Sequence, residues 1–187
     1  TTVYNRFRLW EKQGLFMRLW QNGLQEYDEL VGLDWEWQSL DGVMTKAPLG
    51  GGATGPNPTD RAKRGTKRSQ LCEGHGLPLA IAVDGANVHD TRLVAPTLDA
   101  IVIARPEPSE KATHHVCLDA AYVGGKTQEV IDQHQYIAHI RPIDEDRAQA
   151  RSSDPTKKPR RWVVERLHSW LNRSRRLLVR WEKYTQT

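Results

Sequence analysis

Long apolar segments and paired cysteines are both absent from this sequence. Its apolar stretches, such as residues 79–83, are far shorter than the roughly 20 residues of a membrane-spanning helix, so no segment is predicted to cross a bilayer. The two cysteines, Cys72 and Cys117, lack the spacing of zinc or redox motifs and predict an intracellular protein. Residues 1–6 lack the features of a secretory signal, and both chain ends suggest a piece of a longer protein.

Two common kinds of site are also missing. The glycine-rich residues 50–56 are not followed by the Gly-Lys-Ser/Thr of a P-loop, which excludes that type of nucleoside triphosphate site. The seven histidines include no pair at i, i+4 spacing around a glutamate, so no zinc site is predicted. The chemistry is therefore expected among the carboxylates and the basic residues.

Positive charge is present and unevenly distributed. The 187 residues carry a formal net charge of +4, and this length is typical of one domain. Residues 151–187 contain eleven Lys/Arg against three Asp/Glu, and residues 60–68 contain five against one. Such clusters bind polyanions by releasing counterions from phosphates, but they are also typical of solvated faces that aid solubility. Charge alone leaves both interpretations open.

The spacing of apolar residues predicts alternating helices and strands. We expect helices within residues 3–31 (broken near Gly14 and Gly23), 90–104 (capped by Asp90), 127–134 and 161–181, and strands at 33–41, 69–75, 77–84, 115–119 and 136–140. Residues 45–68, rich in Gly, Pro and Lys/Arg, are expected to form a long basic loop, and residues 142–160 a mobile linker.

This order predicts an α/β fold with a mixed sheet. It matches the ribonuclease H-like arrangement, a mixed sheet flanked by helices, over residues 32–187, with residues 1–31 as a short N-terminal helical segment. In that arrangement carboxylates on the first strand, the fourth strand and a following helix converge. The corresponding residues are Asp41, Asp119 and Glu165.

Three carboxylates that point at one spot repel each other unless a cation neutralises them, and Mg²⁺ prefers oxygen ligands. Two such ions about 3.5–4 Å apart stabilise the attacking and leaving oxygens of an in-line phosphoryl displacement, so the set predicts phosphodiester chemistry. A structural role is the alternative: Glu165 would favour a helix N-terminus, and Asp41 and Asp119 would cap turns.

Four runs, residues 40–48, 55–68, 85–90 (Gly-Ala-Asn-Val-His-Asp) and 161–173, together closely resemble bacterial insertion-sequence transposases of the DDE type, in the group called insertion sequence five. The resemblance implies a ribonuclease H-like catalytic domain in which Asp41, Asp119 and Glu165 bind two Mg²⁺ (or Mn²⁺) ions. It also implies cleavage at transposon ends in double-stranded DNA, strand transfer into target DNA, a homodimer, and a cytoplasmic, nucleoid-associated location in bacteria.

The chain departs from the family pattern at several positions. Related transposases carry a Tyr-Arg-Glu-Lys signature around the Glu; Arg161 fits the Arg, whereas Lys158 and Asn172 stand where Tyr and Lys are expected. Residues 1–31 resemble only the last part of an N-terminal DNA-binding region. Contacts to DNA are expected from Lys46, Arg61, Lys63, Arg64, Lys67, Arg68, Lys158, Arg160, Arg161, His168, Arg173, Arg176 and Arg180.

Two other functions fit the same residues. One is a non-catalytic DNA-binding fragment of a transposase that keeps the basic surface. The other is a hydrolytic nuclease of the same fold, which differs only in its product: cut ends instead of joined ends.

Overall fold

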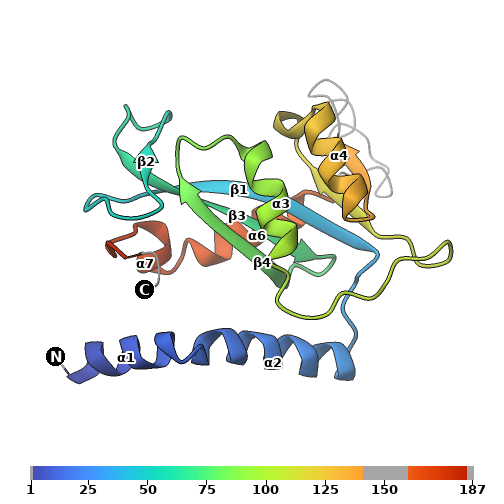
Figure 1. The fold of residues 1–187 in the computed structure, drawn as a ribbon, viewed down its shortest axis with the longest axis horizontal. Coiled ribbons are helices and arrows are strands. Elements are labelled where there is room, and N and C mark those ends of the chain that lie inside the picture. The colour runs from blue at the N-terminus through green and yellow to red at the C-terminus, as the bar shows by residue number, and fades with distance from the viewer. Residues whose placement is uncertain (1, 141–159, 185–187) are drawn as a thin grey trace.

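The computed structural model describes residues 2–140 and 160–184. Its centre is a mixed sheet (Figure 1), whose strands in the described part of the chain are β1 (Trp37–Lys46), β2 (Gly55–Pro56), β3 (Arg64–Glu73), β4 (Pro78–Gly85), β5 (His115–Leu118) and β6 (Ile137–Ile140). β3 pairs antiparallel with β1 and β4, whereas β5 pairs parallel with both β1 and β6. The short β2 pairs with the first residues of β3.

Helical segments flank this sheet. They are α1 (Thr2–Lys12), α2 (Leu15–Leu30), the 3₁₀ turns η1 (Asp90–Leu93) and η2 (Ala120–Tyr122), α3 (Val94–Asp99), α4 (Gly125–Gln133), α6 (Trp162–Leu171) and α7 (Arg175–Leu178). In Figure 1, α3 lies in front of the sheet, α6 lies behind it, and α1 and α2 run in line below. No helix within the described ranges is long and apolar enough to cross a membrane.

Strand alternation gives the sheet two different faces. One face carries Leu40 and Leu71 into the main apolar core, together with Val94 of α3 and Ile131 of α4. The other face is covered by α6, whose buried residues pack against Cys72 in a second, smaller cluster with Val163, Val164 and Leu167. Successive side chains along β1 therefore face α3 and α6 in turn.

The expected ribonuclease H-like fold is confirmed. Three long antiparallel strands, β1, β3 and β4, are followed by a helix, the parallel strands β5 and β6 with α4 between them, and α6 on the far face. β5 and β6 start at His115 and Ile137, close to the starts expected from the sequence. The interruption between α1 and α2 also falls at Gly14, which has a positive φ of 68°.

Several predicted boundaries are wrong. β1 begins at Trp37 and not at residue 33, so Asp41 lies in the middle of a strand and not near its end. The expected loop 45–68 is shorter, because β1 continues to Lys46 and β3 begins at Arg64. Gly23 does not interrupt α2, which runs from Leu15 to Leu30. No other atom lies within 4 Å of the place where a Cβ of this residue would be.

The other errors concern helices. The helix expected over 90–104 is a 3₁₀ turn followed by the six-residue α3, and its N-cap is His89 and not Asp90. The helix expected over 161–181 ends at Leu171, and α7 follows a break at residues 172–174. Most of the predicted linker 142–160, including Lys158, lies outside the described residues.

Candidate active site

Asp41 and Asp119 lie close together, Asp41 on β1 and Asp119 directly after the end of β5. β1 and β5 pair from Trp37 opposite His115 to Ser39 opposite Cys117, where the ladder ends. Asp41 and Asp119 each follow this last pair by two residues, so alternation directs both side chains toward the face that α6 covers, and Asp41 is near enough to act on Asp119 electrostatically. The strand pairing thus brings together two carboxylates that are far apart in the sequence.

Asp119 is held at the point where β5 ends. It is the N-cap of η2, and its Oδ1 accepts a hydrogen bond from the backbone N–H of Ala121 at 2.8 Å. Burial raises the pKa of Asp119, and the negative charges of Asp41 and Asp90 raise it further, whereas the Ala121 hydrogen bond and Arg161 lower it. The net pKa is above the ordinary value, as expected for a carboxylate that shares its surroundings with like charges.

This raised pKa predicts a pH-dependent stability in the absence of metal. The folded state binds the Asp119 proton more tightly than the unfolded state, so the contribution of Asp119 to the unfolding free energy decreases as pH rises through the folded pKa. An Asp119→Asn variant keeps the acceptor for Ala121 N–H and carries no charge. We expect it to be more stable than the wild type at pH 7.5 in EDTA, with the difference vanishing near pH 3.5.

Urea unfolding of both proteins at the two pH values measures this difference. A variant that is less stable than the wild type at pH 7.5 would show that Asp119 is a stabilising capping residue and not a strained member of an acidic pair.

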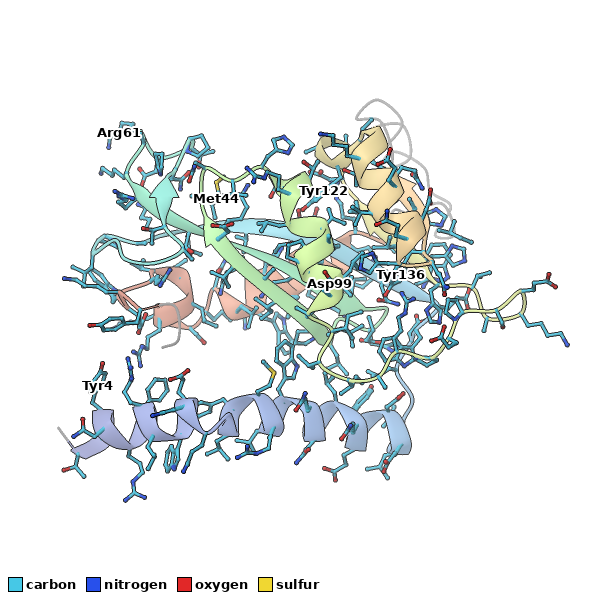
Figure 2. All side chains as sticks on the ribbon, in the orientation of Figure 1. Tyr4, Met44, Arg61, Asp99, Tyr122 and Tyr136 are labelled. Carbon is cyan, nitrogen blue, oxygen red and sulfur yellow. The ribbon has the colours of Figure 1, made fainter. Side chains whose placement is uncertain are left out.

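Tyr122, labelled in Figure 2, is the last residue of η2, the turn that Asp119 caps. Its side chain is buried in the main core, and its hydroxyl has no hydrogen-bond partner among the described residues. Burial raises the pKa of Tyr122, and the charges of Asp41, Asp90 and Asp119 raise it further. The hydroxyl is therefore a proton donor that faces an acidic neighbourhood.

Glu165 is placed differently from the two aspartates. It lies in the first turn of α6, its side chain is 54% exposed, and Arg161 Nε donates to its Oε1 at 3.2 Å. Across residues 2–140 and 160–184, no three His, Cys, Asp or Glu side chains surround a point closely enough to hold a metal ion. Asp41 and Asp119 are brought together, whereas Glu165 is paired with a cation beside them.

His168 lies one turn after Glu165 and faces the sheet. Its side chain is 9% exposed, and its Nε2 is 3.6 Å from Asp41 Oδ2, while Gly42 N–H donates to Asp41 Oδ1 at 2.8 Å. Neither ring nitrogen of His168 has a hydrogen-bond partner in the described part of the chain. His168 therefore packs against a candidate metal ligand and is not on the surface.

The basic residues that the sequence assigned to DNA fall into two groups. Those on the surface are Lys46, Arg61, Lys63, Arg64, Arg160, Arg173 and Arg176; Figure 2 shows Arg61 at the tip of the loop around β2. Arg176 pairs with Glu182, and the partly buried Arg180 donates to backbone carbonyls of Gly52 and Tyr184. Arg160 lies over the Trp37 ring at 4.6 Å.

Lys67 and Arg68 lie inside the protein, not on a basic loop. Both belong to β3, whose residues after Arg64 are all buried. Arg68 faces α6, and its NH2 donates to Asn172 Oδ1 at 3.0 Å; burial lowers its pKa. Arg68 therefore brings a positive charge to the residue that stands at the Lys position of the family signature.

Lys67 faces the opposite side of the sheet, where its Nζ lies 3.0 Å from Asp90 Oδ2. From the sequence, Asp90 is a rival carboxylate for which a helix cap is the favoured role, and its pair with Lys67 is not predicted. The available signal was the run 85–90, which contributes to the resemblance and ends on Asp90.

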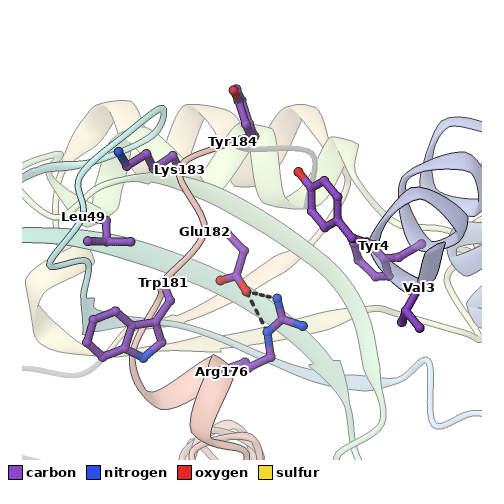
Figure 3. A pocket seen from close by; sticks show the side chains of 9 residues that line it. Val3, Tyr4, Leu49, Arg176, Trp181, Glu182, Lys183 and Tyr184 are labelled. Carbon is purple, nitrogen blue, oxygen red and sulfur yellow. Dashed lines mark hydrogen bonds and ion pairs between the residues drawn. The ribbon is translucent and has the colours of Figure 1, made fainter. Parts of the chain in front are cut away.

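A separate cavity of about 600 Å³ lies between α1 and the segment after α7 (Figure 3). Its walls include Val3, Tyr4, Trp181 and Tyr184, and the Arg176–Glu182 ion pair lies at its side. None of the three candidate carboxylates lines it, so it is distinct from the Asp41–Asp119 site.

Comparison with known proteins gives two matches. The family model for the transposase DDE domain matches residues 38–187, a range that contains all three candidate carboxylates. A Burkholderia cepacia protein assigned as the transposase of insertion sequence element IS402 is 35% identical over 131 residues, which cover 70% of this chain and 60% of the relative. The chain thus spans about 60% of the length of that relative.

Proposed function

The chain belongs to the transposase DDE domain family, and from that premise we propose that it cleaves the ends of a mobile DNA element and joins them to target DNA in a divalent-metal-dependent reaction. The observation that carries the proposal is the Asp41–Asp119 pair, which the β1–β5 register brings to one face of the sheet. Assignment to the group insertion sequence five stays a prediction.

The site residues fit a hard divalent cation. The donors are carboxylate oxygens, which Mg²⁺ and Mn²⁺ prefer, and the nearby Tyr122 hydroxyl is buried without a partner in the described ranges. Asp41 and Asp119 would hold the metal, and Glu165 would complete the set after leaving Arg161. Two bound ions supply the charge that stabilises the attacking and leaving oxygens at the scissile phosphate.

The protein side chains then have distinct tasks. Asp41 is positioned by Gly42 N–H and by the packing of His168, and Asp119 by Ala121 N–H, so neither carboxylate has to be ordered when DNA binds. Exposed basic residues, such as Arg64 and Arg173, would neutralise backbone phosphates and orient the duplex without reading its sequence. A homodimer that engages two ends and a cytoplasmic location at the nucleoid belong to this proposal.

The proposal is tested by cleavage and joining of a labelled, pre-nicked DNA end with Mg²⁺, with Mn²⁺ and with EDTA. We expect joined product with either metal, none with EDTA, and none from Asp119→Asn. Cut ends without joined ends would favour a nuclease. Salt-dependent DNA binding without any product would favour a non-catalytic fragment, which is relevant because the chain spans about 60% of its relative.

A further inference from the structure

A third aspartate, Asp90 of η1, contacts β1 at Gly42, the residue directly after Asp41. Its carboxylate lies so close to the backbone of Gly42 that a Cβ added to this glycine would collide with Asp90 Oδ1. Gly42 directly follows Asp41, so Asp41 faces α6 while Asp90 approaches β1 from the α3 side. The 3₁₀ turns η1 and η2, which begin next to Asp90 and Asp119, also contact each other.

These carboxylates flank one edge of β1. The ladder between β1 and β5 ends at Ser39 and Cys117, so the described strands separate beside Asp41 and Asp119. Asp90 reaches this gap from the opposite face of the sheet. Asp41 and Asp90 are both close enough to Asp119 to act on it electrostatically, so three carboxyl groups lie around the gap.

Lys67 fixes the orientation of Asp90. Lys67 Nζ binds Asp90 Oδ2 at 3.0 Å and the carbonyl of Val88 at 2.7 Å, and the lysine side chain is only 6% exposed. Asp90 itself is 28% exposed, and its Oδ1 points to Gly42. One oxygen of Asp90 is therefore held by a buried cation, and the other is directed toward the gap.

The Tyr122 hydroxyl is the second, independent sign of a ligand here. The residue is 1% exposed, and its hydroxyl lies 3.6 Å from the position that a Gly42 Cβ would take. No hydrogen-bond partner for this hydroxyl exists among the described residues. Leaving a buried donor without an acceptor is unfavourable, so an oxygen that accepts from Tyr122, such as a carboxylate or a group bound with the metal, is expected in this gap.

We propose that Asp90 joins Asp41 and Asp119 as a further carboxylate of the metal site when a metal binds, and that the Lys67 ammonium balances its charge when no metal is bound. The three carboxylates do not surround one point in the metal-free arrangement of the described residues, so the proposal requires them to draw together around the ion. This inference rests on the proposed function, because it assumes that the Asp41–Asp119 pair binds a divalent cation. It assigns a role to the last residue of the run 85–90, and it explains why a lysine of the apparent basic loop is buried.

The competing explanation is that Asp90 only forms an ion pair that stabilises β3. Matched variants separate the two roles. Asp90→Asn removes the carboxylate, whereas Lys67→Met removes the ion pair and keeps the carboxylate. The double variant removes both charges and leaves no buried lysine unpaired, so it controls for a folding defect in Asp90→Asn.

The readout is Mn²⁺ affinity of the whole chain, measured from the electron paramagnetic resonance signal of free Mn²⁺ during titration. We expect Asp90→Asn and the double variant to raise the Kd for Mn²⁺ about tenfold or more, and Lys67→Met to bind Mn²⁺ at least as tightly as the wild type. Wild-type affinity in the double variant, or equal losses in both single variants, would overturn the proposal.

Asp119→Asn separates failure of this inference from failure of the proposed function. If Asp119→Asn loses Mn²⁺ binding while Asp90→Asn and the double variant retain it, only the role of Asp90 is wrong. If the wild type binds no Mn²⁺, or Asp119→Asn binds it normally, the metal site itself is wrong and both conclusions fail.

Discussion

Glu165→Gln is expected to lower metal-dependent strand cleavage about 1,000-fold while the protein stays folded. A carboxylate that holds a catalytic metal contributes several kcal/mol to the transition state, and each 1.4 kcal/mol is a factor of ten in rate. In the structure, Glu165 is exposed and its side chain contacts Arg161, at i, i+4 spacing. Such surface pairs contribute about 0.3–0.5 kcal/mol, so stability should barely change.

Glu129→Gln is the matched control. Glu129 is also an exposed helical glutamate, on α4, and its replacement should leave cleavage unchanged. The assay is single-turnover cleavage of labelled end DNA with Mn²⁺, alongside urea unfolding of each variant. Full activity of Glu165→Gln would mean that Glu165 does not bind the catalytic metal and is only a favourable negative charge at the start of α6.

Glu73→Ala is expected to lower the unfolding free energy by about 3–5 kcal/mol. The Glu73 carboxylate is completely buried at the turn between β3 and β4. It accepts hydrogen bonds from the backbone N–H groups of Asp34 (3.1 Å), His75 (2.9 Å) and Leu77 (2.8 Å), and it lies 3.0 Å from His75 Nδ1. Alanine leaves these donors without an acceptor and leaves a cavity.

Two further variants show how much of this loss in unfolding free energy comes from the Glu73 carboxylate and how much from its contact with His75. Glu73→Gln keeps one acceptor oxygen and should cost less than Glu73→Ala. His75→Ala removes a side chain that is 65% exposed and should cost less than about 1 kcal/mol. Urea denaturation at pH 7 measures all three. If Glu73→Ala costs no more than His75→Ala, the carboxylate does not organise the turn between β3 and β4.

The fold could be predicted from the sequence because most of its strands and helices show clear local periodicity. β5 is a short apolar segment that ends at Leu118, directly before Asp119, and α6 carries Val163, Val164 and Leu167 at helical spacing. The order of these elements then indicated the ribonuclease H-like arrangement. The pairing of Asp41 with Asp119 followed from that topology and from the resemblance to DDE transposases, which includes the run 40–48 around Asp41.

The first half of β3 could not be predicted because its two faces are buried by different partners. Lys67 is neutralised by Asp90 on one side, and Arg68 binds Asn172 on the other. A run of alternating Lys, Arg, Thr and Gly has no apolar face, so it resembles a solvated loop. Only tertiary contacts with residues 21 or more positions away make this segment a strand.

The Asp90 and Glu73 side chains were missed for a related reason. Each is a carboxylate with a partner that no local pattern predicts: a buried lysine from β3 for Asp90, and backbone N–H groups that include Asp34 for Glu73. Asp90 also lies at the start of a helical segment, which favoured the capping role, but it is the first residue of η1 and the cap is His89.

Strand β1 is completed by residues that come more than 100 positions later in the chain. The end of β1 forms a bridge with Val179, the Lys46 carbonyl accepts from Arg180 N–H, and Ser39 Oγ donates to the Arg160 carbonyl. A nascent chain that has not yet released these residues from the ribosome carries an unfinished β1 and an uncovered face of β3. Translation products that stop before residue 160 would therefore lack the contacts that complete β1 and cover β3.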